Sequence, residues 1–405
     1  MRIFFRFLVS SLPAVLLSAV TVGVAPASAD PGFYDPPSPL PGGGNGDVIK
    51  TLPSTYANAK SVRVMYLSRD AGNKAIAVTG TVLVPTKVWG GAGDRPIVAY
   101  APFTAGLGDQ CAPSKTMAGE GGDIVSGFQN SFVNALLSKG FAVAQTDYQG
   151  LGTPGEHTYV VRAAEAHAVL DVVRAAQRLP GTGLSPKAPV GIAGYSEGGG
   201  ASASAVELAP QYAPELDIKG AYVGAAPADK AVLAKSLDGG MYVGFLGYAL
   251  IGLNEAYPEA KILDLANDAG KQLFQEARGT CTMDAVLKYM FRNTTQLTKD
   301  GRPVAAYLAE APFDAIVAAN RIGDLKPSAP VLVEHAQGDD VIPYAIGKQL
   351  GKDWCGKGAN VKFADLFSSP VFAHVLGMTA AQGNAANWLG DRFAGKPATG
   401  NCGQF

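Results

Sequence analysis

The sequence predicts an α/β fold, in which helices cover both faces of a mostly parallel β-sheet. Three observations lead to this prediction. Short apolar runs of strand length recur along the chain, segments with apolar residues at helical spacing separate them, and Gly or Pro marks many of the boundaries. Strands that consist of unbroken apolar runs are buried on both faces, as they are in a parallel sheet between two layers of helices.

Eight segments have the length and composition of strands. Ala75–Pro85 alternates larger apolar residues with small ones, which is typical of a strand with one face in water. The other seven are short and mostly apolar. The predicted strands are Val62–Ser68, Ala75–Pro85, Pro96–Ala101, Phe141–Thr146, Pro189–Gly194, Ile218–Ala226, Ala329–Ala336 and Val361–Phe367.

Helical spacing of apolar residues predicts helices between these strands. Two of the helices have clear ends, because Gly140 follows one and Pro180-Gly181 follows another. Residues from about 228 to 320 contain no convincing strand, so we expect a helical insertion there. The helices predicted outside the insertion are Asn130–Lys139, Val160–Leu179, Gly198–Leu208 and Thr379–Phe393, and those inside it include Tyr257–Arg278 and Thr282–Arg292.

The first 29 residues have the features of a secretory signal peptide. Arg2 and Arg6 precede the apolar stretch Leu8–Val24, and Ala27-Ser28-Ala29 places small residues before a cleavage site at Asp30. A single membrane anchor is the alternative, although Pro13 and several serines interrupt the apolar run. We therefore expect a protein that is secreted or held at the cell envelope.

This organisation divides the chain into five parts. A signal peptide over 1–29 and a flexible leader over 30–46, rich in Pro, Gly and Asp, precede the fold. The leader either wraps the surface of the core or is disordered. The first part of the core covers 47–227, the helical insertion covers 228–320, and the second part of the core covers 321–405. We expect the insertion to pack on the core and not to form an independent domain.

Composition and cysteine usage exclude several classes of protein. Apolar residues make up 47% and charged residues 17% of the 405, and the net charge is −1, so nothing favours binding to nucleic acid. Cys111, Cys281, Cys355 and Cys402 form an even set, which in an exported protein predicts two disulfides with three possible pairings. No two cysteines have CxxC spacing, so no zinc site is expected.

The strongest local motif is Gly194-Tyr195-Ser196-Glu197-Gly198, which has the pattern G-x-S-x-G. A predicted strand precedes it and a helix of small residues follows, which is the context of the nucleophile elbow in the α/β-hydrolase fold. The chain turns so sharply at such a serine that side chains two residues away on either side would collide. We therefore predict that Ser196 is a nucleophile, with a plain glycine-rich turn as the alternative.

A serine needs a histidine to take its proton, and the chain has only four histidines. In this fold the acid and the histidine follow the serine, which excludes His157 and His167 as the base. His335 lies within a predicted strand, where a core histidine is the simpler interpretation. His374 lies on a predicted loop before the last helix, so we predict that His374 is the base.

The acid is expected on the loop after strand Ala329–Ala336, which contains Asp339 and Asp340. The common pattern places the acid four residues before a proline, and Pro343 therefore selects Asp339. Asp340 is then a loop charge in water or a cap on the following helix. The predicted triad is Ser196, Asp339 and His374.

Two backbone N–H groups are expected to form an oxyanion hole beside the serine. One belongs to Glu197, directly after Ser196, and the other to Thr104 or Ala105 after strand Pro96–Ala101. A solvent-directed carboxylate is the simple interpretation of the Glu197 side chain. A role in adjusting the working pH is the alternative. His157 and Tyr159 either line the mouth of the site or lie on the surface.

Several motifs, in their order along the chain, resemble the secretory lipase family of fungi and actinobacteria, the group that contains Candida-type lipase A. The resemblance extends from about residue 50 to 402. Two positions depart from the best-known fungal member, which has glycine in place of Glu197 and aspartate in place of Thr104. The motifs are DQCAPS at Asp109–Ser114, DYxGLG at Asp147–Gly152, GYSxGG at Gly194–Gly199 and the loops of Asp339 and His374.

The resemblance implies an α/β-hydrolase with a helical cap inserted before the strand that carries the acid. It also implies the triad named above and two disulfides, Cys111–Cys281 and Cys355–Cys402. Members of the family hydrolyse triacylglycerols and other carboxylic esters without a cofactor. The expected partners are therefore an acyl-ester substrate and, transiently, a lipid interface.

Two rival functions remain open at the level of sequence. A secreted peptidase or acyltransferase can use the same fold and triad. The apolar stripe over Met241–Gly252 is by default core packing, but an acyl-binding face or mobile lid would favour lipid substrates. A non-catalytic exported binding protein would be expected to lack part of the triad, and every member is present.

Overall fold

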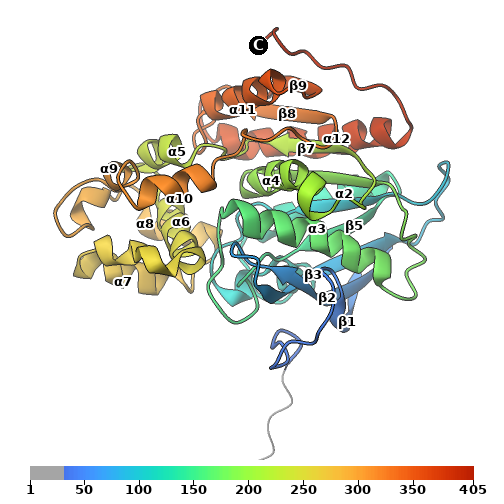
Figure 1. Cartoon of the computed structure of the whole chain (residues 1–405), viewed down its shortest axis with the longest axis horizontal. Coiled ribbons are helices and arrows are strands. Elements are labelled where there is room, and N and C mark those ends of the chain that lie inside the picture. Colours follow the sequence, from blue (N-terminus) through green and yellow to red (C-terminus); the bar gives the residue numbers. More distant parts are fainter. Residues whose placement is uncertain (1–31) are drawn as a thin grey trace, which may run out of the picture. The chain divides into compact units, whose positions relative to one another are not determined.

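The computed structural model describes residues 32–405, so the predicted signal peptide lies outside the described residues. This part of the chain contains one nine-stranded sheet in the order β1-β2-β3-β5-β4-β6-β7-β8-β9 (Figure 1). Among the helices of residues 32–405, none combines the length and the hydropathy that a bilayer crossing requires.

The sheet is antiparallel at one edge and parallel elsewhere. β1, β2 and β3 pair antiparallel in sequence, and β3 pairs antiparallel with β5. From β5 onward every neighbouring pair is parallel, which confirms the predicted mostly parallel sheet. The strands are β1 Val48–Tyr56, β2 Ala59–Arg69, β3 Ala75–Pro85, β4 Ile97–Ala101, β5 Ala142–Thr146, β6 Val190–Tyr195, β7 Ile218–Gly224, β8 Val331–Ala336 and β9 Val361–Leu366.

Helices cover both faces of the sheet, and each central strand contributes to two cores. Ile97 and Ala99 of β4 pack into one buried cluster, whereas Val98 and Tyr100 pack into the other. Because successive side chains of a strand point to opposite faces, a fully apolar strand feeds both layers. The first layer contains α3 Arg162–Arg178, α4 Glu197–Tyr212 and α11 Tyr344–Gly356, and the second contains α1 Pro113–Met117, α2 Ser126–Ser138 and α12 Ala373–Phe393.

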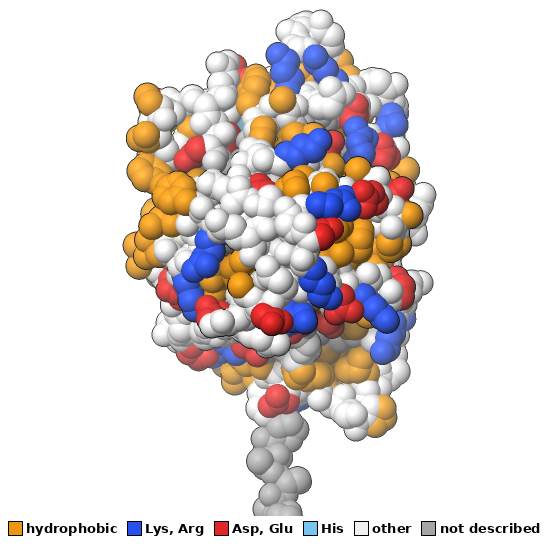
Figure 2. Space-filling view, turned by 90° about the vertical axis from the view of Figure 1, so that its left-hand side faces the viewer, with side chains coloured by type: hydrophobic (Ala, Val, Ile, Leu, Met, Phe, Trp, Pro, Cys, Tyr) orange, Lys and Arg blue, Asp and Glu red, His pale blue; other side chains and the backbone are white. Residues whose placement is uncertain are grey.

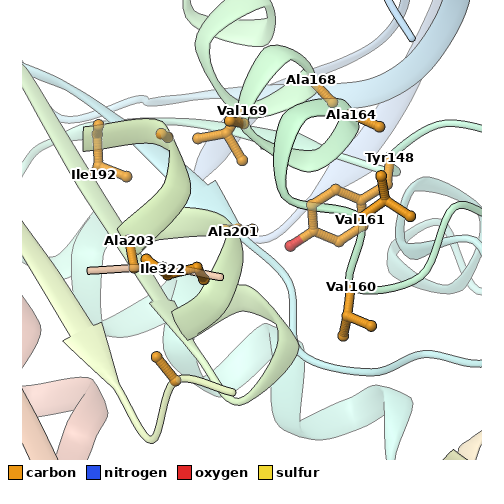
Figure 3. Close-up of a cluster of buried hydrophobic side chains, with 14 of the residues drawn as sticks. Tyr148, Val160, Val161, Ala164, Ala168, Val169, Ile192, Ala201, Ala203 and Ile322 are labelled. Atoms are coloured by element: carbon orange, nitrogen blue, oxygen red, sulfur yellow. The ribbon is translucent and has the colours of Figure 1, made fainter. Parts of the chain in front are cut away.

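Small residues bring α3 and α4 close to each other and to the sheet. Figure 3 shows Ala164 and Ala168 of α3, Ala201 and Ala203 of α4, and the strand residue Ile192 in one buried cluster. Alanine contributes apolar surface with little bulk, so the two helices can approach closely. This approach fixes the beginning of α4 relative to the end of β6.

The chain between β7 and β8 forms helices on one side of the sheet (Figure 1, left). Its central helix is α6, most of whose residues are buried against neighbouring helices. The face seen in Figure 2 carries hydrophobic side chains along one edge and interspersed charges elsewhere. The helices are α5 Lys230–Leu237, α6 Val243–Ala256, α7 Asp268–Ala277, α8 Thr282–Tyr289, α9 Val304–Tyr307 and α10 Phe313–Ala319.

Three elements differ from the sequence prediction. Strand β1 was not predicted, because it is a half-exposed edge strand in which Pro53 interrupts the pattern. Helix α12 begins at Ala373 and not at Thr379, so Gly377 lies inside the helix, where a Cβ would stand 3.0 Å from the Tyr195 hydroxyl. The predicted helix Tyr257–Arg278 is broken into two short 3₁₀ turns and α7, with Lys261 in a left-handed conformation between the turns.

Residues 32–46 lie against the core. The Tyr34 hydroxyl is 3.0 Å from Ser114 Oγ and accepts from Arg63 at 3.2 Å, and the N–H of Gly46 donates to the carbonyl of Leu67. Of the two interpretations offered for the leader, packing on the surface describes these residues.

The two disulfides join Cys111 to Cys281 and Cys355 to Cys402, which are the pairs that the family resemblance implies. The first joins the segment after β4 to the beginning of α8 across 170 residues of sequence. The second joins the end of α11 to the C-terminal tail across 47 residues. Both therefore connect segments that are distant along the chain.

We expect the double variant Cys111→Ala/Cys281→Ala to lose more stability than Cys355→Ala/Cys402→Ala. Loop-closure entropy grows with the length of the closed loop, and this relation gives losses of about 5 and about 4 kcal/mol. Urea unfolding of both variants under oxidising conditions measures the two losses. The reverse order would show that strain or residual structure, and not loop length, dominates.

Candidate active site

Ser196 lies on a sharp turn between β6 and α4. Its backbone has φ 60° and ψ −123°, a conformation that residues with a side chain rarely adopt. A Cβ at Gly194 would stand 2.1 Å from the carbonyl oxygen of Gly198, and one at Gly198 would stand 2.0 Å from that of Ala101. The glycines of the motif are therefore required by the close approach of the backbone, as the sequence predicts.

The structure brings Ser196, His374 and Asp339 together. His374 Nε2 is 2.9 Å from Ser196 Oγ, and His374 Nδ1 is 2.7 Å from Asp339 Oδ2. Because a carboxylate only accepts, Nδ1 carries the proton and Nε2 is free to accept from the serine hydroxyl. All three side chains are buried or nearly so.

Asp339 has a second histidine partner, His335, which the sequence predicts only as a core residue. His335 Nε2 donates to the carbonyl of Ile342 at 2.8 Å and lies 3.3 Å from Asp339 Oδ2. Burial alone would raise the pKa of Asp339. The charge of His374 and hydrogen bonds from His335 and His374 outweigh burial and hold this pKa well below its ordinary value. The Asp339 carboxyl therefore stays ionised beside His374.

Asp340 has a different partner from the one predicted for it. Its Oδ1 accepts the backbone N–H of His374 at 3.0 Å, and its Oδ2 accepts from the Tyr242 hydroxyl at 3.3 Å. Asp340 thus satisfies a free N–H in the first turn of α12 and not one in the helix that follows it in sequence, α11. Neither of these hydrogen bonds goes to the imidazole ring.

His374 lies in the first turn of α12, whereas the sequence analysis placed it on a loop before the helix. The helix begins as early as Ala373 because Asp340 accepts the N–H of His374 and because the carbonyl of His374 also accepts a hydrogen bond. The Tyr195 hydroxyl donates to the carbonyl of His374 at 2.7 Å. Tyr195, the residue before Ser196, therefore holds the backbone of His374 directly.

Both predicted oxyanion-hole residues lie next to Ser196. Thr104 lines the same cavity as Ser196 and His374, whereas Ala105 does not. In the described part of the chain, neither the N–H of Thr104 nor that of Glu197 donates to a protein acceptor. Free N–H groups of this kind are the donors that an oxyanion needs.

The Glu197 side chain is buried, so the interpretation that it points into solvent is wrong. Its Oε1 is 2.9 Å from His157 Nε2, and both side chains are 1% exposed. His157 and Tyr159 are also buried, so neither lies on the surface. These contacts were not predicted, because the residues come from three separate segments of sequence.

The two most conspicuous motifs outside the triad bind each other. Asp147 accepts the N–H and the hydroxyl of Ser114 and the hydroxyl of Thr79. The N–H of Gly152 donates to Asp109 at 2.9 Å. These buried contacts lock the segment after β4 to the segment after β5, which is a structural role and not a chemical one.

An apolar cavity of about 410 Å³ opens beside Ser196 and His374. Its volume is that of a small-molecule binding site. Five of its large apolar side chains are also exposed, which makes them its rim, and the most exposed is Ile124 at 77%. The rim residues are Ile124, Phe128, Leu287, Met290 and Phe372.

A second, narrower cavity of about 40 Å³ leads from Ser196 into the inserted helices. Most of its lining is aliphatic, and half of the lining residues, Lys230 among them, come from α5 and α6. Tyr159 and Glu197 also line it. The apolar stripe predicted over Met241–Gly252 therefore does more than fill a core, because part of it faces the space beside the nucleophile.

The sheet is mostly parallel and lies between layers of helices. A serine on a strained strand-to-helix turn is hydrogen-bonded to a histidine, which is hydrogen-bonded to an aspartate. Together these features define an α/β-hydrolase. Residues 122–401 match the model of the secretory lipase family. The chain belongs to this family. Lipases are carboxylic-ester hydrolases, so the family gives the class of reaction.

Individual relatives agree with this assignment. A probable inactive lipase of Mycobacterium tuberculosis is 30% identical over 92% of this chain and 83% of its own length. Lipase 5 of Candida albicans is 29% identical over 93% of this chain and 82% of its own length. The closed state of Candida antarctica lipase A has a TM-score of 0.81 and 27% identity, covering 93% of this chain and 88% of that one.

We expect Gly198→Ala to destabilise the protein by about 2–3 kcal/mol or more, because its Cβ would overlap the carbonyl oxygen of Ala101. Gly383→Ala is the matched control, since a Cβ at this exposed position of α12 meets nothing within 4 Å. The control should gain about 0.5–1 kcal/mol from helix propensity. Chemical unfolding measures both changes, and equal effects would contradict the steric argument.

Proposed function

We propose that this protein is a secreted lipase, which hydrolyses water-insoluble acyl esters such as triacylglycerols through an acyl-enzyme on Ser196. The observation that carries the proposal is the chain of hydrogen bonds from Ser196 through His374 to Asp339, which ends at an apolar cavity. The secreted lipases among the relatives and the two disulfides support export.

The geometry supports a two-step mechanism. His374 takes the proton of Ser196 Oγ as the oxygen attacks the ester carbonyl, and Asp339 stabilises the imidazolium that forms. The N–H groups of Glu197 and Thr104 hold the negative oxygen of the tetrahedral intermediate. The imidazolium then protonates the departing alcohol, and water hydrolyses the acyl-enzyme by the same steps.

The lining of the large cavity favours apolar substrates. Among the described residues that line it there is no Asp, Glu, Lys or Arg side chain. A peptidase that reads a charged terminus, or an acyltransferase with a polar acceptor, would be expected to place such groups there. We propose that residues 228–320 act as a cap, whose α5 and α6 line the narrower cavity and hold an alkyl chain beside the nucleophile.

The rim of the large cavity gives the proposed partner. Its five exposed apolar side chains come from the segment before α2, from α2, from α8 and its end, and from the residue before α12. They surround the opening where a lipid substrate would enter. Apolar residues gathered in this way mark a binding surface, and we propose that it associates transiently with a lipid–water interface.

Asp339→Asn should lower kcat on a soluble p-nitrophenyl ester by about 10³- to 10⁴-fold, because the carboxylate no longer holds the imidazole in its working tautomer. Asp340→Asn is the matched control, since an amide oxygen can still accept the N–H of His374. The control should stay within about tenfold of the wild type. If Asp340→Asn lost more activity than this, Asp339 would be the wrong choice of acid.

An ester chain-length series tests the substrate class. We expect turnover of long-chain esters to rise when they form micelles, because the apolar rim then binds the interface. Ser196→Ala should abolish turnover of every ester while the protein stays folded. Replacing the exposed Ile124 and Leu287 with Ser should remove most of the micelle-dependent gain and leave short soluble esters unaffected. Preference for short esters without any gain at interfaces would make the protein a plain esterase.

A further inference from the structure

A buried carboxyl group lies directly beside the nucleophile. Glu197 is the first residue of α4, and its backbone N–H is one of the free donors at the beginning of that helix. Its side chain is buried among Thr104, His157 and Glu165. A buried ionised carboxyl group without a cationic partner is costly, so the arrangement calls for a physical reason.

The contacts of His157 indicate how many protons the pair of Glu197 and His157 holds. His157 Nδ1 is 3.1 Å from the carbonyl of Gln149, which only accepts, so Nδ1 carries a hydrogen. In a neutral imidazole Nε2 then accepts, and its neighbour Glu197 Oε1 at 2.9 Å must be the donor. The pair therefore holds one proton more than a carboxylate and a neutral histidine would hold.

Burial favours the neutral form of both partners. Burial raises the pKa of Glu197 well above its ordinary value, although hydrogen bonding by Thr104 and Glu165 partly offsets it. Burial also lowers the pKa of His157, against the opposing charge of Glu165. The two directions agree with a carboxylic acid that donates to a neutral imidazole, and not with an ion pair.

The other titratable groups around the pair come from three elements. Glu165 of α3 is buried, accepts the N–H of Val160 at 2.7 Å, and has its pKa raised by burial and by Glu197. Tyr148 and Tyr159 lie on the segment between β5 and α3, and burial raises the pKa of both. Burial lowers the pKa of Lys230 of α5 to about 8, against the charge of Glu165.

The same contacts reach the second donor of the oxyanion hole. Thr104 Oγ1 is 2.8 Å from the Tyr159 hydroxyl, and the Tyr159 ring packs edge-on against His157, with ring centroids 5.9 Å apart. The carbonyl of Thr104 accepts from Thr282 Oγ1 at 2.5 Å. Thr104 is thus held on two sides, and one of them leads through Tyr159 and His157 to the Glu197 carboxyl group.

We propose that the Glu197 side chain is a positioning residue, which, held as a carboxylic acid against His157, fixes the two backbone donors of the oxyanion hole. One donor is its own N–H and the other is that of Thr104. A neutral acid can do this without opposing the negative oxygen, whereas an ionised carboxylate beside the hole would repel it. The inference rests on the proposed ester hydrolysis and adds a positioning residue to the residues that carry it out.

The kinetic test compares the wild type with two variants on a soluble p-nitrophenyl ester. Glu197→Ala should lower kcat by about 10- to 100-fold with little change in KM, because the donors lose their alignment. Glu197→Gln keeps a donor for His157 and should restore most of kcat. Its activity should also persist to higher pH than that of the wild type, because an amide cannot ionise. Equal kcat in the Ala and Gln variants would overturn the proposal.

Glu207→Gln is the matched control. Glu207 is a second buried glutamate of α4, bonded to Arg162, Trp354 and the N–H of Gly323, and far along the helix from the nucleophile. This change should lower stability while leaving kcat, KM and the pH profile unchanged. If it reproduced the kinetic effect of Glu197→Ala, general loosening of α4 would explain both.

A stability test keeps the inference separate from the proposed function. A pKa raised on folding means that the stabilising contribution of Glu197 is fully present below the unfolded pKa, about 4.3, and is lost as pH rises through the folded pKa. The test compares two proteins that both carry Ser196→Ala, one with Glu197 and one with Glu197→Gln. The unfolding free energy of the first minus that of the second should fall as pH rises from about 4 to 9. A difference that does not change with pH would overturn the inference that Glu197 holds a proton against His157.

The two tests fail differently. If the wild type turns over no ester, the proposed function is wrong, while the pH dependence of unfolding still decides whether Glu197 holds a proton. If esters are turned over and Glu197→Ala matches the wild type, the function stands and the positioning role is wrong.

Discussion

The close approach of α4 to the ends of β4 and β7 is the constraint on which the site depends. Cβ atoms at Gly198 and Gly199 would stand 2.0 Å from the carbonyl oxygens of Ala101 and Gly224. Because the helix presses against both strands, the turn at Ser196 must adopt an unfavourable backbone conformation. That turn directs the hydroxyl to the cavity and leaves the first N–H groups of α4 free, so the proposed nucleophile and one proposed oxyanion donor follow from one packing contact.

The parts of the fold and site that depend on local chemistry could be predicted from the sequence. Buried strands such as Ile97–Ala101 are unbroken apolar runs, and their parallel arrangement follows from burial on both faces. The glycines around Ser196 reveal the turn, because only glycine fits at their positions. Asp339 and His374, which the structure brings together with Ser196, could be selected as candidates by their order after the serine and by the proline that follows Asp339.

The parts that depend on contacts between distant segments could not be predicted. Loop shape could not be predicted either: His335 approaches Asp339, only four residues later, because the loop after β8 folds back over the strand, and no local pattern records this. The first turn of α12 forms because Asp340 caps it from another loop, so the sequence around His374 alone suggested a loop. The burial of Glu197 likewise depends on His157, forty residues earlier in the chain.

The cavity beside Ser196 has walls of unequal stiffness. On one side, Thr282 bonds to the carbonyls of Thr104 and Ala105 and a disulfide joins the adjacent segments, so the oxyanion loop and the beginning of α8 form one unit. On the other side, residues 368–372, just before α12, are joined to another segment by the hydrogen bond from the N–H of Gly338 to Ser368 Oγ. A bulky substrate therefore gains room by displacing the segment before α12, next to His374, while the wall that carries the oxyanion donors keeps its shape.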